Sequence, residues 1–484
     1  MQVNWQPFAA PTARYVHPQA AADRFEPGDG STRPPTRQEL IRQLLNPDRE
    51  VKELRVDWKQ NIGGRLLSRA GVGQDGRLAF VSDDRLVVLK PDGSEQMSVP
   101  QGEPDVFNIF LPPVVDPGGV VAAGGAGLTS FGPSGKKLWH RKIGEVVTRP
   151  AVGQDGTVYA AGGDGRMVAF DSRGKKLWAT DVRPTLVELY REDREAWCES
   201  LRRDLADPDK ADRKDVLESL LQDAEQELAD PEFGKDVTVK FEGGPSLGPD
   251  GRVYCFTQVG PLFSLDGRTG EIQWVQPDTA NYLDEGGLSF TPDGQVLGVT
   301  GNSLLRCIRP EDGEVLFDYG CWIEKRLDQV SPEEADDARR SGNMGSCGLP
   351  DLSPDGETIY WGGRDGKVRA VDRQGNKVFT VEIPHNAGYA GEMDVSVGQD
   401  GCLYCANSRG LTVLSSRGEE LWRYETSDKY SYATLAGDKV ILNTYSGEVV
   451  CLDSRDLKQR AEAAAEEDAP APRIAVGNGW VTVG

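Results

Sequence analysis

Short runs of alternating hydrophobic and polar residues fill the chain from about residue 53 to residue 455. These runs are too short for helices. They are separated by Gly, Asp, Pro and Asn, which favour turns. The pattern is typical of β-strands joined by tight turns, so this part of the chain is predicted to be all-β.

One turn-and-strand motif recurs along this region. Clear copies are VGQDGRLAFV from Val72, VGQDGTVYAA from Val152, LGPDGRVYCF from Leu247, FTPDGQVLGV from Phe290, LSPDGETIYW from Leu352 and VGQDGCLYCA from Val397. VVDPGGVVAA from Val114 and LAGDKVILNT from Leu435 are weaker copies. Eight copies of one motif indicate an architecture built from repeated supersecondary units.

Each unit carries three turn signals, seen most clearly as Asp155-Gly156, Asp164-Gly165 and Arg173-Gly174. Three tight turns predict four antiparallel strands. A large side chain follows the third turn by four residues in seven units, at Met97, Trp139, Trp178, Trp274, Phe317, Phe379 and Trp422. Four strands with a bulky residue on the last one are typical of a propeller blade. We therefore predict an eight-bladed β-propeller, with seven blades plus an irregular unit as the alternative.

The eighth unit lacks a fourth strand, because the sequence after EVVCLDSRDL turns helical. The run ELRVDWKQNI, residues 53–62, precedes the first unit and supplies Trp58. We expect residues 53–60 to pair with the sheet formed by residues 435–452, which would close the ring without a free strand edge.

Two insertions interrupt the repeat. Residues 183–235 show helical spacing of apolar residues on either side of Asp207-Pro208, which predicts an amphipathic helical hairpin. Nine basic and sixteen acidic residues give this hairpin a net charge of −7. The second insertion, residues 321–347, contains a predicted helix start with Ser331 as N-cap. Residues 1–52 are predicted to be a mostly disordered tail with a short helix, and residues 456–484 a helix, a linker and a hairpin.

The insertions supply the candidate partner-binding residues, Tyr190, Trp197, Leu201 and Trp322. An aromatic or leucine side chain on a helix that the ring does not need can enter a groove of a partner protein. The alternative for the aromatic residues is that they pack the hairpin onto itself or onto the propeller rim.

Charge and composition disfavour several classes of function. The 484 residues hold 55 Lys and Arg against 77 Asp and Glu, a net charge of −22, which disfavours nucleic acid as a partner. Only three His are present, which disfavours histidine-based catalysis. The sequence shows neither an apolar run long enough to span a membrane nor a signal peptide, so we expect a cytoplasmic protein without a membrane span.

LDGRTGEIQW, residues 265–274, and FDSRGKKLW, residues 170–178, carry a family resemblance. They resemble the tryptophan-docking motif of the pyrroloquinoline-quinone-type β-propeller repeat, found in quinoprotein alcohol dehydrogenases and in the assembly lipoprotein of the Bam complex. The resemblance covers roughly residues 53–455. It implies the fold, whereas function varies widely on this scaffold.

The resemblance also implies what an enzyme of the family would need: a disulfide between adjacent cysteines, a tryptophan floor, and calcium held by Glu, Asn and Asp. This sequence has no adjacent cysteine pair and no Cys-x-x-Cys-His motif. Cys402 and Cys405 are three residues apart on a predicted strand and would point to opposite faces. We therefore expect no catalytic residues, no cofactor and no metal site.

These observations favour a non-catalytic β-propeller scaffold that binds protein partners of unknown identity. Two alternatives are a quinone-dependent oxidoreductase or other propeller enzyme, and an envelope assembly factor similar to the Bam-complex lipoprotein.

Overall fold

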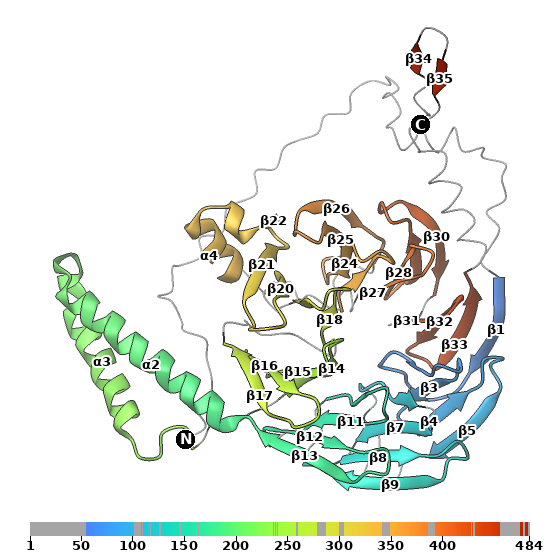
Figure 1. Ribbon diagram of the computed structural model, residues 1–484, viewed down its shortest axis with the longest axis horizontal. Helices are drawn as coiled ribbons and strands as arrows, with labels where there is room; N and C mark the ends of the chain where they lie inside the picture. Colours follow the sequence, from blue (N-terminus) through green and yellow to red (C-terminus); the bar gives the residue numbers. More distant parts are fainter. Residues whose placement is uncertain are drawn as a thin grey trace, which may run out of the picture. The chain divides into compact units, whose positions relative to one another are not determined.

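The computed structural model describes residues 55–454 and the backbone of residues 475–477 and 480–482. Within 55–454 it leaves out 101–107, 109, 117, 125–126, 145–147, 163, 236, 238, 240, 258–259, 278–286, 300–303, 341–348, 386–392, 427 and 429–430. Eight antiparallel sheets surround a central axis, as Figure 1 shows. The predicted eight-bladed propeller is confirmed.

Blades 1 to 8 are numbered in chain order. Blade 1 contains β2 (Gly71–Val72), β3 (Leu78–Val81), β4 (Arg85–Leu89) and β5 (Glu95–Pro100), and blade 2 contains β6 (Val114–Asp116), β7 (Gly119–Gly124), β8 (Gly127–Phe131) and β9 (Lys137–Lys142). Blade 3 contains β10 (Ala151–Val152), β11 (Val158–Ala161), β12 (Arg166–Phe170) and β13 (Lys176–Asp181), and blade 4 contains β14 (Phe241–Leu247), β15 (Arg252–Thr257), β16 (Leu262–Asp266) and β17 (Ile272–Gln276).

Blade 5 has five strands, β18 (Ser289–Phe290), β19 (Val296–Val299), β20 (Leu304–Ile308), β21 (Val315–Gly320) and β22 (Lys325–Arg326). Blade 6 contains β23 (Asp351–Leu352), β24 (Thr358–Gly362), β25 (Lys367–Asp372) and β26 (Lys377–Glu382), and blade 7 contains β27 (Asp394–Val397), β28 (Leu403–Asn407), β29 (Gly410–Leu414) and β30 (Glu420–Glu425). Blade 8 contains β31 (Ser431–Ala436), β32 (Lys439–Thr444), β33 (Glu448–Asp453) and β1 (Arg55–Asn61).

The ring closes in blade 8, where the two ends of the propeller meet. β1 pairs antiparallel with β33, with Trp58 opposite Cys451 and Lys59 opposite Val450. The predicted pairing of the N-terminal strand with the last unit is therefore present, and it covers the edge that β33 would otherwise expose.

The hydrophobic core lies between neighbouring blades. The second and third strands of a blade are buried along nearly their whole length, as in β11 and β12, because each blade is covered on both faces by its neighbours. The fourth strand is more exposed, and in β13 Trp178 is the one buried residue. This burial explains why the middle strands are continuous apolar runs.

The recurrent large side chain of each fourth strand packs against the next blade. The indole N–H groups of four tryptophans donate to backbone carbonyls of the following blade: Trp58 to Pro91 at 3.0 Å, Trp139 to Ser172 at 3.0 Å, Trp178 to Gly267 at 3.0 Å and Trp274 to Pro310 at 2.8 Å. At seven of the eight interfaces the large side chain lies over a glycine with positive φ, namely Gly93, Gly135, Gly174, Gly270, Gly313, Gly375 and Gly418 among the described residues. Trp422 faces blade 8, whose third and fourth strands share no turn because they come from opposite ends of the propeller.

The first insertion is a helical hairpin, as predicted. It consists of α2 (Arg183–Ala206), a 3-10 helix (Pro208–Arg213) and α3 (Lys214–Ala229), and it extends away from the blades in Figure 1. Asp207 ends α2, and its side chain accepts a hydrogen bond from the Asp209 N–H at 3.0 Å. Proline after this residue breaks the helical hydrogen bonding, so the chain can reverse there.

The second insertion packs beside blade 5. β22 leads through a 3-10 helix (Leu327–Gln329) to α4 (Pro332–Arg340). The Glu334 N–H donates to Ser331 Oγ at 3.2 Å, as expected for an N-cap. Near the C-terminus, β34 (Ala475–Gly477) and β35 (Trp480–Thr482) form the predicted hairpin. The predictions for residues 1–52 and for the helix and linker after residue 455 lie outside the described residues.

Candidate functional site

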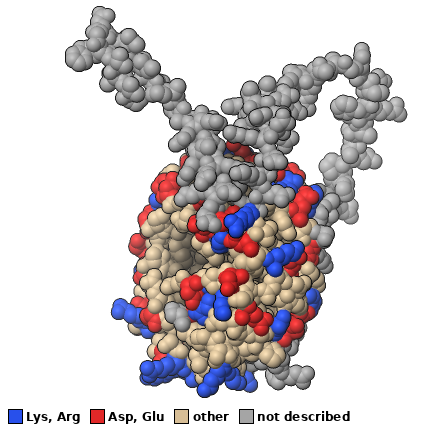
Figure 2. Space-filling model, turned by 90° about the vertical axis from the view of Figure 1, so that its right-hand side faces the viewer, with Lys and Arg blue, Asp and Glu red and all other residues tan. Residues whose placement is uncertain are grey.

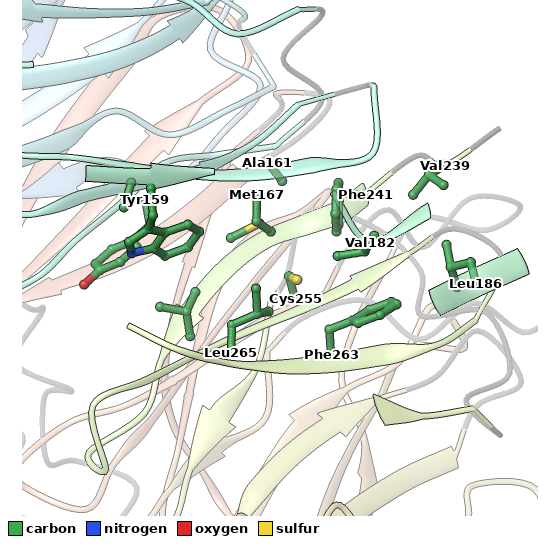
Figure 3. Packing of buried hydrophobic residues seen from close by; sticks show 13 residues of the cluster. Tyr159, Ala161, Met167, Val182, Leu186, Val239, Phe241, Cys255, Phe263 and Leu265 are labelled. Carbon is green, nitrogen blue, oxygen red and sulfur yellow. The ribbon is translucent and has the colours of Figure 1, made fainter. Parts of the chain in front are cut away.

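The root of the helical hairpin is part of the propeller core. Val182 and Leu186 are almost fully buried in a cluster that also contains Val239, Phe241 and Phe263 of blade 4. Figure 3 shows Val182 and Leu186 on the side of this cluster formed by Phe241 and Phe263. The first turn of α2 is therefore held between blades 3 and 4, so the hairpin leaves the propeller in a defined direction.

Tyr190 packs inside the hairpin. Its ring stacks on Phe233, with 5.3 Å between ring centroids, and its hydroxyl donates to Glu227 Oε1 at 2.6 Å. Burial, followed by the bond to Glu227, raises the pKa of the Tyr190 hydroxyl. The ring also contacts the Arg194 guanidinium. These contacts join α2 to the segment after α3.

Trp197 and Leu201 lie further along α2. Trp197 is half-buried, and the Arg194 guanidinium lies 5.1 Å from its ring centroid. Leu201 is 5% exposed, and Cys198 and Ala224 are buried as well. Tyr190, Trp197 and Leu201 thus contribute to the packing of the hairpin, and Leu201 in particular is covered by its neighbours. Their role in partner binding stays a prediction.

Apolar side chains are exposed elsewhere on the insertions. Val216 is 61% exposed and Leu220 is 37% exposed on α3, one helical turn apart. Trp322, the fourth candidate, is 49% exposed in the turn between β21 and β22. Helical spacing predicted the hairpin but could not show that the Val216 side chain stays outside the helix pair.

A cavity of about 530 Å³ lies at the propeller axis. It is lined by the first strands of blades 1, 2, 3, 4, 5 and 8 and by the residues just before them. Most of the lining is proline or aliphatic, but Arg69 and Arg149 also contribute. Arg69 forms an ion pair with Asp394, the first residue of β27. Sequence reasoning missed Arg149; the available signal was an arginine at a position where other repeats have glycine.

The seven described cysteines are free and buried. Burial raises the pKa of the Cys307 and Cys402 thiols to about 12. Cys402 precedes β28 and Cys405 lies within it, and Cys347 is outside the described residues. In the described part of the chain no three His, Cys, Asp or Glu side chains gather where they could hold a metal ion. These cysteines do not match the adjacent pair that the resemblance associates with a quinone site.

Charge is spread over the blades. On the face that Figure 2 shows, acidic and basic side chains are interspersed. In the part of the chain that the structure describes, no helix combines the length and apolar character needed to cross a membrane.

The fold and the docking tryptophans define a pyrroloquinoline-quinone-type β-propeller, a class that includes both enzymes and non-enzymatic proteins. The chain belongs to the family described as outer membrane protein assembly factor BamB, whose sequence model matches residues 124–320 and 353–477. No curated protein matches the sequence significantly.

Two solved structures with a TM-score above 0.5 share the fold at low sequence identity, and a third structure is similar with a lower score. Quinohemoprotein alcohol dehydrogenase from Comamonas testosteroni is 13% identical with a TM-score of 0.54, over 84% of this chain and 77% of that one. The computationally designed Ika8 protein is 11% identical with a TM-score of 0.54, over 81% and 98%. BamB from Moraxella catarrhalis is 15% identical with a TM-score of 0.48, over 82% and 87%.

Proposed function

We propose that this protein is a non-catalytic interaction protein, in which the propeller is a rigid base and the α2–α3 hairpin binds a protein partner. The observation that carries the proposal is the exposed apolar pair Val216 and Leu220 on a hairpin that the ring does not need for closure. Ordering 53 residues between β13 and β14 opposes folding through lost conformational entropy, so a role beyond blade packing favours their retention.

Rigid attachment supports the same role. Leu186 anchors α2 in the core between blades 3 and 4, and Tyr190 joins α2 to the end of the hairpin. A surface that is already ordered loses less entropy on binding than a flexible segment does. The exposed pair is therefore presented in a fixed geometry.

Charge indicates the kind of partner. The hairpin carries a net charge of −7, and acidic side chains flank the apolar pair, among them Asp215, Glu218 and Asp223. A complementary surface would combine an apolar contact with a basic rim, because opposite charges accelerate encounter and fix the register of binding. We propose a protein partner with such a surface.

The family match favours one more specific candidate. Outer-membrane protein assembly is the role printed for the family, so an envelope assembly factor is our second candidate function. It requires an envelope location, whereas the sequence prediction is cytoplasmic. Fractionation of cells that make the tagged full-length protein separates the two, and quinone or calcium in the purified protein would instead favour the enzyme alternative.

The main proposal is tested with matched polar substitutions. Val216→Gln and Leu220→Gln are combined in one variant, because glutamine keeps helix propensity while removing the apolar contact. The control combines Leu138→Gln and Leu177→Gln, which are 54% and 49% exposed on the outer strands of blades 2 and 3. Tagged proteins are purified from cells, and partners are identified by mass spectrometry.

We expect the hairpin variant to lose its main partner while its melting temperature stays at the wild-type value. The control should keep that partner. Replacing residues 183–235 with a Gly-Ser linker should also abolish the interaction and leave the β-rich circular dichroism intact. Retention of every partner by both hairpin variants would contradict the proposal and direct attention to another face.

A further inference from the structure

Arg69 and Arg149, which line the axial cavity, occupy the same position of the repeat. This position lies three residues before the apolar residue that begins each copy of the turn-and-strand motif. It is occupied by Arg69 in blade 1, Arg149 in blade 3, Gly244 in blade 4, Gly287 in blade 5 and Asp394 in blade 7. Arg69, Arg149 and Gly287 precede the innermost strand of their blades. Asp394 begins β27, and Gly244 lies within β14. Because the repeats are related by rotation about the axis, these side chains meet around the same central space.

Arg149 extends across two neighbouring blades. A Cβ atom on Gly244 would lie 2.5 Å from Arg149 Cγ, and a Cβ atom on Gly287 would lie 2.6 Å from Arg149 Nη2. Any other residue at either position would collide with the arginine. Gly244 lies outside the left-handed region of φ, so close approach of Arg149 is what requires glycine there.

A second donor approaches the same point. The Ser246 hydroxyl oxygen would lie 2.9 Å from the Cβ atom on Gly287, so it flanks that glycine together with the guanidinium. Ser246 Oγ accepts a hydrogen bond from the Leu288 N–H at 2.9 Å, which orients the side chain and leaves its hydroxyl hydrogen to donate. The guanidinium and the hydroxyl therefore converge on the space above Gly287.

The charge of Arg149 is not neutralised within the described residues. None of them forms an ion pair or a side-chain hydrogen bond with its guanidinium, and the cavity lining contains no Asp or Glu. Burial lowers the pKa of Arg149, yet an arginine side chain stays charged in proteins. Arg69 shows the contrast, because its charge is compensated by Asp394. A half-buried charge that the described residues do not neutralise is unfavourable, so this site favours a bound anion.

We propose that the axial cavity binds a small oxyanion, a phosphate- or carboxylate-bearing molecule, through the Arg149 guanidinium and the Ser246 hydroxyl. A planar guanidinium matches both oxyanions because it can donate two parallel hydrogen bonds. A cavity of about 530 Å³ is large enough for a small metabolite, and its proline and aliphatic walls limit competition from water. The site is independent of the hairpin and of its partner.

The test measures binding to the full-length protein. Thermal melting and isothermal titration are recorded with inorganic phosphate and, separately, with citrate, against sodium chloride at equal ionic strength. The melting temperature should rise by about 3 °C when the concentration of free probe is 100 times its Kd. Saturation by phosphate alone or by citrate alone identifies the class of ligand.

Two substitutions of Arg149 and one control test the assignment. Arg149→Gln should abolish the shift and raise the melting temperature of the anion-free protein, because it removes a charge that the described residues do not compensate. Arg149→Lys keeps the charge but loses the planar fork, so affinity should fall about tenfold. Arg268→Gln, at an exposed turn of blade 4, should behave as wild type.

Two results would overturn the proposal. One is the absence of binding by either probe beyond the effect of chloride. The other is an Arg149→Gln variant that keeps the shift, or that is less stable than wild type without anion, since either would give Arg149 a structural role. Partner capture should be unchanged in Arg149→Gln, so failure here is distinguishable from failure of the proposed function.

Discussion

The interlocking of neighbouring blades can be tested at the contact between Trp178 and Gly270. Trp178 is 8% exposed, and its indole N–H donates to the Gly267 carbonyl. A Cβ atom on Gly270 would lie 2.5 Å from the indole ring, and Gly270 has a φ of +75°. Gly270→Ala therefore introduces backbone strain and a steric clash at the same time.

Gly251 separates these two effects. It lies in the same blade with a φ of +80°, but nothing lies within 4 Å of its Cβ position. Gly251→Ala should cost about 1–2 kcal/mol of unfolding free energy from backbone strain alone. Overpacking against Trp178 should add about 1–3 kcal/mol in Gly270→Ala, for a total of about 2–5 kcal/mol.

A double-mutant cycle isolates the clash. Trp178→Ala alone should cost about 3–5 kcal/mol, because it removes a large buried side chain and its hydrogen bond. In the Trp178→Ala background the clash with the indole is gone, whereas Thr180 Oγ1 still lies 2.8 Å from the Cβ position. Gly270→Ala should therefore cost about 1–3 kcal/mol less there than in the wild-type background. The two substitutions should thus be coupled by about 1–3 kcal/mol, with the double variant more stable than additivity predicts.

The assay is guanidinium unfolding at 25 °C, followed by circular dichroism, with the slope of the transition compared across variants. Additivity within about 0.5 kcal/mol would refute the reasoning, because residues that share no contact behave in that way. Equal destabilisation by Gly270→Ala and Gly251→Ala would refute it as well, since the clash would then contribute nothing.

Two further predictions concern ring closure and a buried ion pair. A chain that begins at residue 62 lacks β1 and should melt at a lower temperature and aggregate. A chain that begins at residue 50 should melt as the full chain does. Equal melting temperatures for the two truncated chains would contradict ring closure by β1. Asp318→Ala should cost about 3–5 kcal/mol in chemical unfolding, because it removes the carboxylate to which the buried Arg306 guanidinium donates at 2.7 and 2.8 Å. Asp312→Ala, which breaks an exposed pair, should cost less than about 1 kcal/mol, and a similar loss in both variants would count against the burial argument.

The blade architecture could be predicted because its determinants are local. Tight turns need glycine at positive φ, and the short apolar runs between turns are visible within ten residues. The large residue four positions after the third turn, such as Trp178, was also recognisable, because the repeat places it at the same step each time. The closure of the ring by β1 could be predicted by counting strands, because the eighth unit has only three strands of its own.

The site residues could not be predicted in the same way, because they depend on contacts between distant repeats. Arg149 lies against Gly244 and Gly287, which belong to two other blades. Helical spacing likewise predicted an amphipathic hairpin, but only the packing of α2 against α3 decides that Leu201 is buried and Val216 is exposed. A sequence pattern shows which residues share one face of a helix, but it does not show which part of the protein packs against that face.

The rim and the axis of this propeller place different demands on the chain. At the rim, the large side chain fits a glycine of the next blade at seven of the eight interfaces, and this repeated contact leaves little freedom for sequence change. At the axis, corresponding positions carry arginine, glycine and aspartate, so the repeats are not equivalent there. Fold requirements alone would favour similar residues at related positions, because the backbone environment is the same. Arg69 and Asp394 compensate each other in an ion pair, whereas the described residues leave the charge of Arg149 unpaired, so the proposed anion would account for an arginine at this position of blade 3.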